Sequence, residues 1–287
     1  MSLFRRRLAP YLLVLPGGVW LLLFFAIPMI TMLSLSLQQG DIVSGYRFTG
    51  HWQTYLDSVE AYHTQLVRSL VYGAIASLAM AVLAFPVAYW IAFHGGKRKP
   101  TYLFLILLPF FVSFVLRTIS WRQILTDEGP VLHPLRELGL VSASFHLIGT
   151  PFAVIAGLVY NFLPFMVLPI YVALERIDPR VVEAARDLYA GPATAFRRVI
   201  FPLALPGVFA GVLLTFVPAS SDYVNSSVLG SSDTTMIGQV IQAQYLQNSD
   251  YPTASALSFV LMAVLLIGIF AYARLLGTED VMKVAAR

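Results

Sequence analysis

The groups that could carry chemistry are few in this chain, and their spacing argues against catalysis. The chain contains no cysteine, which excludes disulfides, thiolate zinc sites and cysteine nucleophiles. No phosphate-binding loop of the form GxxxxGK(S/T) occurs. The five histidines show neither a metal-binding spacing nor an arrangement typical of hydrolases; they are His51, His63, His94, His133 and His146. We therefore expect no catalytic residue, no metal site and no cofactor within this chain.

One acidic side chain stands beside the interior of an apolar segment. Asp222 follows Pro218 near the end of segment 203–223, and ionisable groups at membrane depth are costly and usually functional. A carboxylate opposes the dipole at a helix C-terminus, yet that dipole, the carboxylate and the face of Tyr223 would together favour a cation. The structural alternative is a solvated residue at the start of a loop.

Three further residues are candidates for a solute pathway. Trp121 lies in one apolar segment, and Tyr160 and Asn161 lie in the next. Each of them could instead pack within a helix bundle or anchor at the membrane interface, where Trp and Tyr are enriched. Together with Asp222 and Tyr223 they form the predicted substrate pathway.

A short charged segment separates two of the apolar segments. Asp178 and Pro179 are a strong helix start, because Asp caps an N-terminus and proline has its φ already set. We predict one helix over about 179–188 and a second short helix that begins at Pro192 and ends before Pro202. Such a pair could serve as a rigid lever or as a solvated amphipathic connector.

The elements that must position these residues are membrane spans. Of the 287 residues 58% are hydrophobic and 12% are charged, whereas a soluble domain carries about 25% charged residues. A spanning helix needs roughly 20 apolar residues at about 1.5 Å rise each. Six segments qualify: about 11–37, 66–93, 102–124, 151–173, 203–223 and 252–276. We predict an all-α polytopic membrane protein with six transmembrane helices, in which residues 1–287 form a single transmembrane domain.

The distribution of lysine and arginine predicts how these spans are oriented. Of the 19 basic residues, 14 lie on the side of the two termini, the 94–101 loop and the 174–202 loop. The other 5 lie on the side of the connections at about 38–65, 125–149 and 224–251. We therefore expect both termini to be cytoplasmic, and we expect no nucleic-acid binding. The first segment is too long for a signal peptide, which predicts an uncleaved span; a twin-arginine export signal is the alternative.

The charged segment carries a family pattern. Residues 183–202 read EAARDLYAGPATAFRRVIFP, which resembles the EAA loop of permease subunits from binding-protein-dependent ABC importers. The family pattern is EAA, three residues, Gly, nine residues, Ile, one residue and Leu-Pro. Tyr189 therefore stands at the position of the family's glycine, which normally supplies a left-handed turn. Gly191, two residues later, could take over that role.

The resemblance extends over residues 11–276. The segments 107–118, 157–171, 178–188 and 216–241 look like the first permease subunit of spermidine/putrescine importers. The resemblance implies a type I ABC importer permease of a bacterial plasma (inner) membrane that works by alternating access. It also implies that the solute is a polyamine.

In such permeases the EAA loop contacts a cytoplasmic ATPase, so the resemblance assigns coupling to Glu183, Ala184, Ala185, Tyr189 and Gly191. Small alanines permit close approach, and the glutamate can pair with a basic residue of the partner. Two copies of an ABC ATPase would bind ATP and Mg²⁺, so this chain would not be an enzyme. The other implied partners are a second permease subunit, a periplasmic or lipid-anchored solute-binding protein, and membrane lipid.

Three alternatives stay open. A member of the same family could import another cationic or zwitterionic solute, such as an amino-acid derivative, thiamine or ferric iron. An ion-coupled secondary transporter would need coupling-ion groups near the membrane midplane, and the predicted spans lack an acidic residue at that depth. A polytopic membrane enzyme is disfavoured by the missing nucleophile and metal-binding sets.

Overall fold

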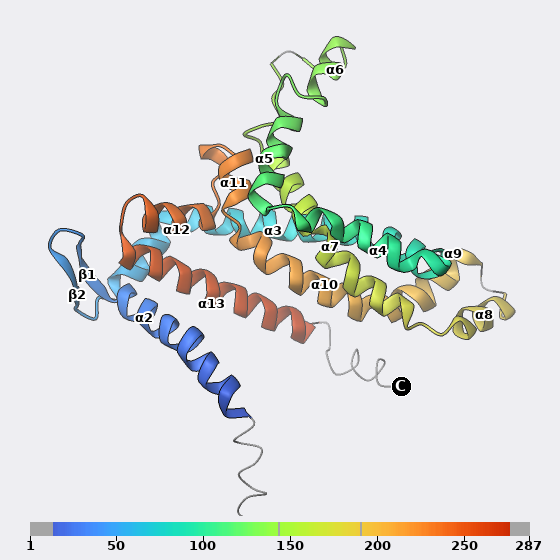
Figure 1. Cartoon of the computed structure of the whole chain (residues 1–287), viewed down its shortest axis with the longest axis horizontal. Coiled ribbons are helices and arrows are strands. Elements are labelled where there is room, and N and C mark those ends of the chain that lie inside the picture. The colour runs from blue at the N-terminus through green and yellow to red at the C-terminus, as the bar shows by residue number, and fades with distance from the viewer. Residues whose placement is uncertain (1–13, 143, 190, 276–287) are drawn as a thin grey trace, which may run out of the picture. The chain divides into compact units, whose positions relative to one another are not determined.

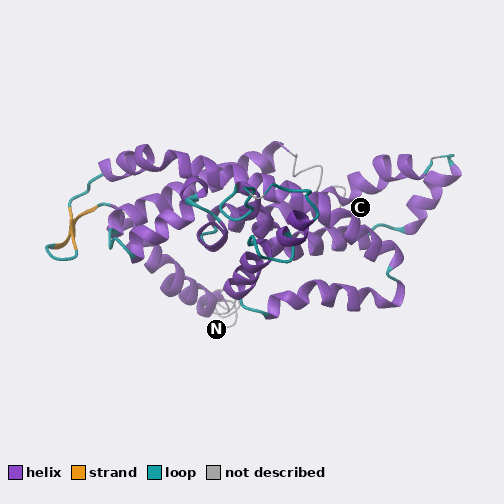
Figure 2. Cartoon of the chain, turned by 90° about the horizontal axis from the view of Figure 1, so that it is seen from above, coloured by secondary structure: helices purple, strands orange, loops and turns teal. Residues whose placement is uncertain are grey.

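The computed structural model describes residues 14–142, 144–189 and 191–275, and most of them are helical (Figures 1 and 2). In chain order the elements, with η for a π or 3-10 turn, are η1 (Leu22–Ala26), α2 (Ile27–Ser36), β1 (Gln38–Asp41), β2 (Gly45–Phe48), α3 (Gln53–His94), η2 (Gly96–Arg98), α4 (Lys99–Leu107), η3 (Leu108–Phe111), α5 (Phe114–Leu125), α6 (Leu132–Glu137), α7 (Pro151–Glu175), α8 (Pro179–Asp187), α9 (Pro192–Ala195), η4 (Phe196–Ile200), α10 (Phe201–Ser221), α11 (Val224–Leu229), η5 (Ser232–Thr234), α12 (Ile237–Leu246) and α13 (Tyr251–Leu275). The described residues divide into two compact units, 14–62 with 241–262 and 63–240 with 263–275.

Most of the predicted spans are present as long apolar helices. Among the described residues, five helices are long and apolar enough to cross a membrane: Val14–Ser36, Gln53–His94, Pro151–Glu175, Pro192–Ser221 and Tyr251–Arg274. A sixth span is present only if a bent pair is counted as one. The prediction of a largely helical chain is therefore confirmed, and the predicted number of six spans is reached when the bent pair is counted as one span.

The third predicted span, 102–124, is broken rather than one continuous helix. The chain bends by 91° between Gly96–Phe111 and Phe114–Leu125. Val112 adopts an extended conformation, with φ −94° and ψ 141°. Pro109 lies just before the break and cannot donate a backbone N–H, which weakens helical continuity there. The bend aims α5 away from α4.

The fifth span is continuous where the sequence predicted an interruption. The predicted helix end before Pro202 is wrong. Residues Pro192–Ser221 form one helical run of 30 residues. Pro202 lacks the N–H that would donate to residue 198, and the π turn η4 lies at this point. A change of hydrogen-bond spacing accommodates the missing donor, so α9 continues into α10.

The segments predicted as connections between spans contain regular secondary structure rather than loops alone. Residues 38–48 form a two-stranded antiparallel hairpin in which Gln38 pairs with Phe48, and α11, η5 and α12 fill most of 224–251. The backbone N–H of Ser44, helped by its hydroxyl and by the N–H of Val43, lowers the pKa of Asp41 in the turn. Helix α3 begins at Gln53, well before the predicted 66, and its backbone leaves the helical conformation at Tyr62.

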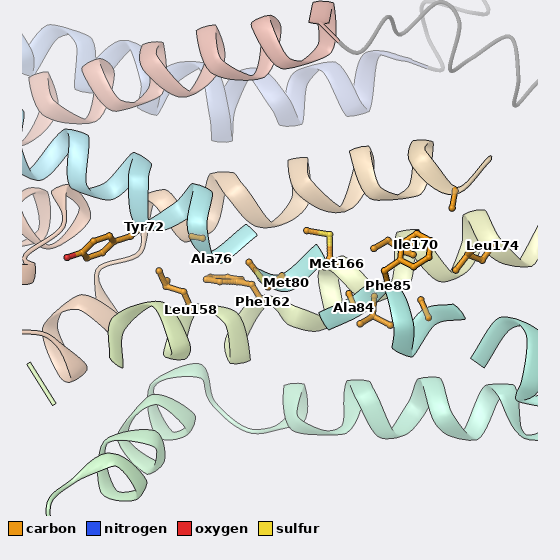
Figure 3. Packing of buried hydrophobic residues seen from close by; sticks show 14 of the residues in the cluster. Tyr72, Ala76, Met80, Ala84, Phe85, Leu158, Phe162, Met166, Ile170 and Leu174 are labelled. Carbon is orange, nitrogen blue, oxygen red and sulfur yellow. The ribbon is translucent and has the colours of Figure 1, made fainter. Parts of the chain in front are cut away.

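The core lies in the unit of residues 63–240 and 263–275, where α3 packs against α7 (Figure 3). The labelled side chains of α3 are Tyr72, Ala76, Met80, Ala84 and Phe85, and those of α7 are Leu158, Phe162, Met166, Ile170 and Leu174. Alanines alternate with larger residues along this face of α3, so side chains of α7 can pack between them.

Helices α7 and α10 approach each other through two glycines. A Cβ on Gly207 would lie 2.5 Å from both Ala173 Cβ and Pro169 O, and one on Gly211 would lie 2.5 Å from Met166 Sδ. Glycines four residues apart allow close backbone approach between membrane helices. This contact holds α7, which carries Tyr160 and Asn161, against α10, which leads to Asp222.

Candidate functional site

The predicted start of the charged segment is confirmed. Asp178 Oδ1 accepts the backbone N–H of Arg180 at 2.9 Å, and α8 begins at Pro179 as predicted. Val182 packs against the hydrophobic core, whereas Glu183 and Ala184 are exposed. Helix α8 is therefore fixed by its apolar side and presents the Glu-Ala pair outward.

The sequence suggested that Gly191 supplies the left-handed residue of the turn after α8, but the structure has that conformation at another residue. Tyr189 itself has φ 60°, in the left-handed region, and its side chain is 98% exposed. Gly191 is extended, with φ −62° and ψ 162°, and caps α9. The role proposed for Gly191 is therefore wrong, because the left-handed conformation lies at Tyr189 instead.

An ion pair joins the base of this segment to the preceding loop. Lys99 Nζ lies 3.0 Å from Glu175 Oε2, and Glu175 is the last residue of α7. The two side chains are 25% and 41% exposed, so water screens the pair and its contribution to stability is small.

A buried polar network occupies the other predicted site. Asp222 Oδ1 accepts the backbone N–H of Asn225 at 2.7 Å and its side-chain Nδ2 at 3.1 Å. Asn161 Nδ2 donates to Asn225 Oδ1 and to Thr118 Oγ1, both at 3.1 Å. Since Thr118 lies on α5, Asn161 on α7 and Asn225 on α11, the network ties three helices together.

Asp222 is not the solvated loop residue of the structural alternative, because it is only 8% exposed. It follows the last residue of α10, where a carboxylate opposes the helix dipole. Its oxygen, however, accepts an N–H from the first turn of α11, whose positive end favours a carboxylate. The second helix thus offsets the unfavourable position that the sequence indicated.

The other predicted pathway residues are brought together only in part. The rings of Trp121 and Tyr160 meet edge to face, with centroids 5.2 Å apart. Asn161 reaches Asp222 through Asn225. Tyr223 is 46% exposed.

The sequence reasoning missed Asn225 and Thr118, which complete the buried network. Asn225 follows Asp222 by three residues, which is the spacing of a helix-capping pair, and this was the available signal. Thr118 has no comparable local signal, because it meets Asn161 only through the bend that precedes α5.

Arg117 lies beside this network and is buried rather than extended toward water. Its guanidinium carbon is 4.6 Å from the ring centroid of Phe110 and 5.7 Å from that of Phe114. No carboxylate pairs with it in the described part of the chain. The ring faces stabilise its charge.

Five or six long apolar helices among the described residues, with the exposed helix α8 between two of them, define a multi-pass membrane protein. The family described as "Binding-protein-dependent transport system inner membrane component" matches residues 8–276. The chain belongs to this family, and it is a multi-pass protein of the bacterial inner membrane. The resemblance seen in the EAA loop is thereby confirmed.

Two relatives and two solved structures illustrate the match. The spermidine/putrescine transport system permease protein PotB of Haemophilus influenzae is 35% identical over 256 residues, covering 89% of this chain and 90% of the relative. PotB of Escherichia coli K12 is also 35% identical, covering 89% and 93%. A bacterial alginate ABC transporter chain superposes with TM-score 0.68 at 18% identity, covering 94% of this chain and 96% of that one. A chain of the MetNI methionine ABC transporter gives TM-score 0.53 at 19% identity, with coverages of 77% and 94%. At these identities the structures show the fold alone.

Proposed function

We propose that this chain is a permease subunit of an ATP-driven importer for polyamines, such as spermidine and putrescine. The observation that carries the proposal is the 35% identity to permeases of spermidine/putrescine transport systems over 89% of this chain. The similarity runs through both the charged segment and the stretch around Asp222, so it covers the two predicted sites.

The partners proposed are a second permease subunit, two copies of a cytoplasmic ABC ATPase and a solute-binding protein. One structural neighbour is described as an alginate ABC transporter in complex with a periplasmic protein, which supports a binding protein as one kind of partner. Each permease would form half of the pathway, and both termini would face the cytoplasm with the ATPase. ATP and Mg²⁺ would be bound by that ATPase.

In this proposal α8 is the coupling element. The exposed carboxylate of Glu183 and the exposed Ala184 are available to a partner, and Ala185 is half-buried beside them. Tyr189 is also available to a partner, because it is 98% exposed. A helix anchored by Val182 on one side and offered to the ATPase on the other would transmit motion to the spans.

The proposed solute path involves the group of residues at the end of α10. Asp222 supplies a negative charge close to the exposed Tyr223, and Trp121 with Tyr160 supplies ring faces that attract organic cations. Asn161 would act by holding Asn225 and, through it, the position of Asp222.

Reconstitution tests the proposal. The chain is combined with its neighbouring permease, ATPase and binding protein in liposomes, and uptake of radiolabelled spermidine is measured with and without ATP. We expect uptake that requires ATP and the binding protein. Uptake driven by an ion gradient without ATP would instead indicate a secondary transporter. Uptake of thiamine, an amino-acid derivative or ferric iron in place of polyamines would keep the family and change the solute.

A further inference from the structure

An apolar groove runs between α7 and α10, which pack side by side within the unit of residues 63–240 and 263–275 (Figure 1). Its volume is about 430 Å³. The two helices approach most closely at Gly207, where an added Cβ would lie 2.5 Å from Ala173 Cβ, and both residues line the groove. Every other lining residue is apolar as well, with the single exception of Arg176.

Large apolar side chains border the groove and are not covered by the described part of the chain. Phe165 and Val172 of α7 are 38% and 45% exposed, and Leu214 of α10 is 53% exposed. On a membrane-spanning helix such side chains lie against lipid or against another protein. The groove is therefore available to an occupant from outside this chain.

The length of the groove matches one leaflet of a bilayer. From Phe165 to Arg176 the chain advances eleven residues, which is about 16 Å at helical rise. Half of a hydrocarbon core that is about 30 Å thick is about 15 Å. Arg176 directly follows the last residue of α7, so it stands where the span ends, and Phe165 stands near the middle of the membrane. A single acyl chain has this reach.

The charge at the end of the groove is left without a partner by the rest of the described chain. Arg176 is exposed and takes part in no ion pair there. Its neighbour Glu175 is engaged elsewhere, because both of its carboxylate oxygens accept from Lys99 Nζ, at 3.1 and 3.0 Å. Asp178 caps α8 by accepting the backbone N–H of Arg180. The guanidinium is thus free to bind an anion at the level of the lipid headgroups.

We propose that this groove binds an anionic phospholipid, with one acyl chain between α7 and α10 and the phosphate on Arg176. The arginine stem can lie along the apolar wall while its planar guanidinium reaches the headgroup and binds phosphate through two parallel N–H bonds. Basic pockets between spanning helices are typical sites for anionic headgroups. The inference needs only a multi-pass membrane chain, so it does not depend on the proposed solute.

Photolabelling tests the site. The complete transporter is placed in phosphatidylcholine nanodiscs with phosphatidylglycerol that carries a diazirine on one acyl chain, and labelled peptides are located by mass spectrometry. We expect labelling within 165–173 and 206–214. Unlabelled phosphatidylglycerol should compete about fivefold better than phosphatidylethanolamine with the same chains, as expected for one basic residue near an anionic headgroup. Inorganic phosphate should not compete, because it brings no chain.

Two variants separate the headgroup from the chain. Arg176→Gln should abolish the fivefold preference while labelling by the chain persists, which also shows that the variant has folded. Arg274→Gln, at an exposed arginine outside the groove, should keep the preference. Val172→Trp fills the groove and should lower labelling at least fivefold, whereas Ile267→Trp, at a 69% exposed position outside it, should not.

Equal competition by the two phospholipids, or an unchanged preference in Arg176→Gln, would overturn the site. Labelling of the groove in the isolated chain but not in the complete transporter would also overturn it, because another subunit would then cover the groove. A transporter that does not carry spermidine, yet shows the labelling and its dependence on Arg176, would disprove the polyamine function and support the lipid site.

Discussion

Two polar regions of this apolar chain differ in burial. The segment around α8 is exposed: Tyr189 is 98% accessible, and Glu183 and Ala184 face solvent. The network at the end of α10 is buried: Asp222 is 8% accessible, and Asn161 is fully enclosed. Both regions lie between or beside spans, and the sequence predicted both as candidate sites because of their polar residues.

The difference separates polar groups that are open to solvent from polar groups that hold helices together. Exposed polar groups keep their hydration until a partner replaces it, so they are free to form intermolecular contacts. Buried polar groups must satisfy one another, because an unpaired one costs free energy in a medium without water. The Asp222 network therefore sets the relative positions of α5, α7 and α11, and any solute contact there depends on that arrangement.

A charge reversal on the exposed helix α8 should have the largest effect. Glu183→Lys should abolish transport-coupled ATP hydrolysis while membrane abundance stays at the wild-type level, because the side chain makes no contact that the fold requires. ATPase activity of the reconstituted complex, stimulated by solute-loaded binding protein, is the measurement. Glu128→Lys, at a residue with a 90% exposed side chain, is the matched control and should retain activity. Wild-type hydrolysis in Glu183→Lys would refute the coupling role.

Removing the charge at Asp222 separates solute contact from fold. Asp222→Asn keeps an oxygen that can accept the N–H of Asn225, so abundance should fall little. Spermidine uptake should fall by about tenfold or more, as expected when a hydrogen bond to a charged group is lost. Asp222→Ala should lower both uptake and abundance. If Asp222→Asn takes up spermidine at the wild-type rate, the carboxylate does not belong to the pathway.

Within the buried region, Asn161→Leu tests the network itself. The substitution removes the donor that serves both Asn225 and Thr118. Leaving such groups unsatisfied should cost about 1–3 kcal/mol of stability, seen as a lower thermal midpoint of the purified protein. Asn248→Leu, at an exposed asparagine, should change the midpoint little. Equal midpoints for the two variants would mean that the network does not hold the helices.

The turn after α8 allows a paired test of backbone conformation. Tyr189→Gly should stabilise the turn by about 1–2 kcal/mol, because glycine adopts a left-handed φ without the cost to a side chain. Gly191→Ala should be neutral, since Gly191 is extended and a Cβ there would meet nothing within 4 Å. Hydrogen exchange of the α8 amides measures both. A destabilising Gly191→Ala with a neutral Tyr189→Gly would restore the interpretation that Gly191 forms the turn.

The smallest effect is expected at the exposed ion pair. Lys99→Ala removes the partner of Glu175 at the base of the charged segment. Because both groups are partly solvated, the loss should be about 0.2–1 kcal/mol, and ATP hydrolysis should change less than twofold. A loss as large as that of Glu183→Lys would show that this pair transmits the coupling motion.

Much of the fold could be predicted because its signals are local. Long apolar runs at 151–173, 203–223 and 252–276 each became one helix, since no other backbone structure satisfies its polar groups within lipid. Asp178 capped α8 as its position beside Pro179 indicated. These outcomes depend on residues only a few positions apart.

The remaining features depend on residues that are distant in sequence. The effect of a proline is one example: Pro109 precedes a 91° bend, whereas Pro202 lies within a continuous helical run. The missing N–H is the same in both cases, and the surrounding packing decides whether a π turn can accommodate it. Periodicity alone does not distinguish the two.

The order of residues therefore determined that the chain crosses a membrane, where its helices lie and which segment carries the family's coupling pattern. Hydrophobicity and capping act over a few neighbouring residues, and they can be read directly. Only the tertiary structure decided that Asp222 is enclosed rather than solvated and that Thr118 meets Asn161. Burial and hydrogen-bond partners are properties of elements packed together, and the free energy of a polar group depends on that environment rather than on its neighbours in the chain.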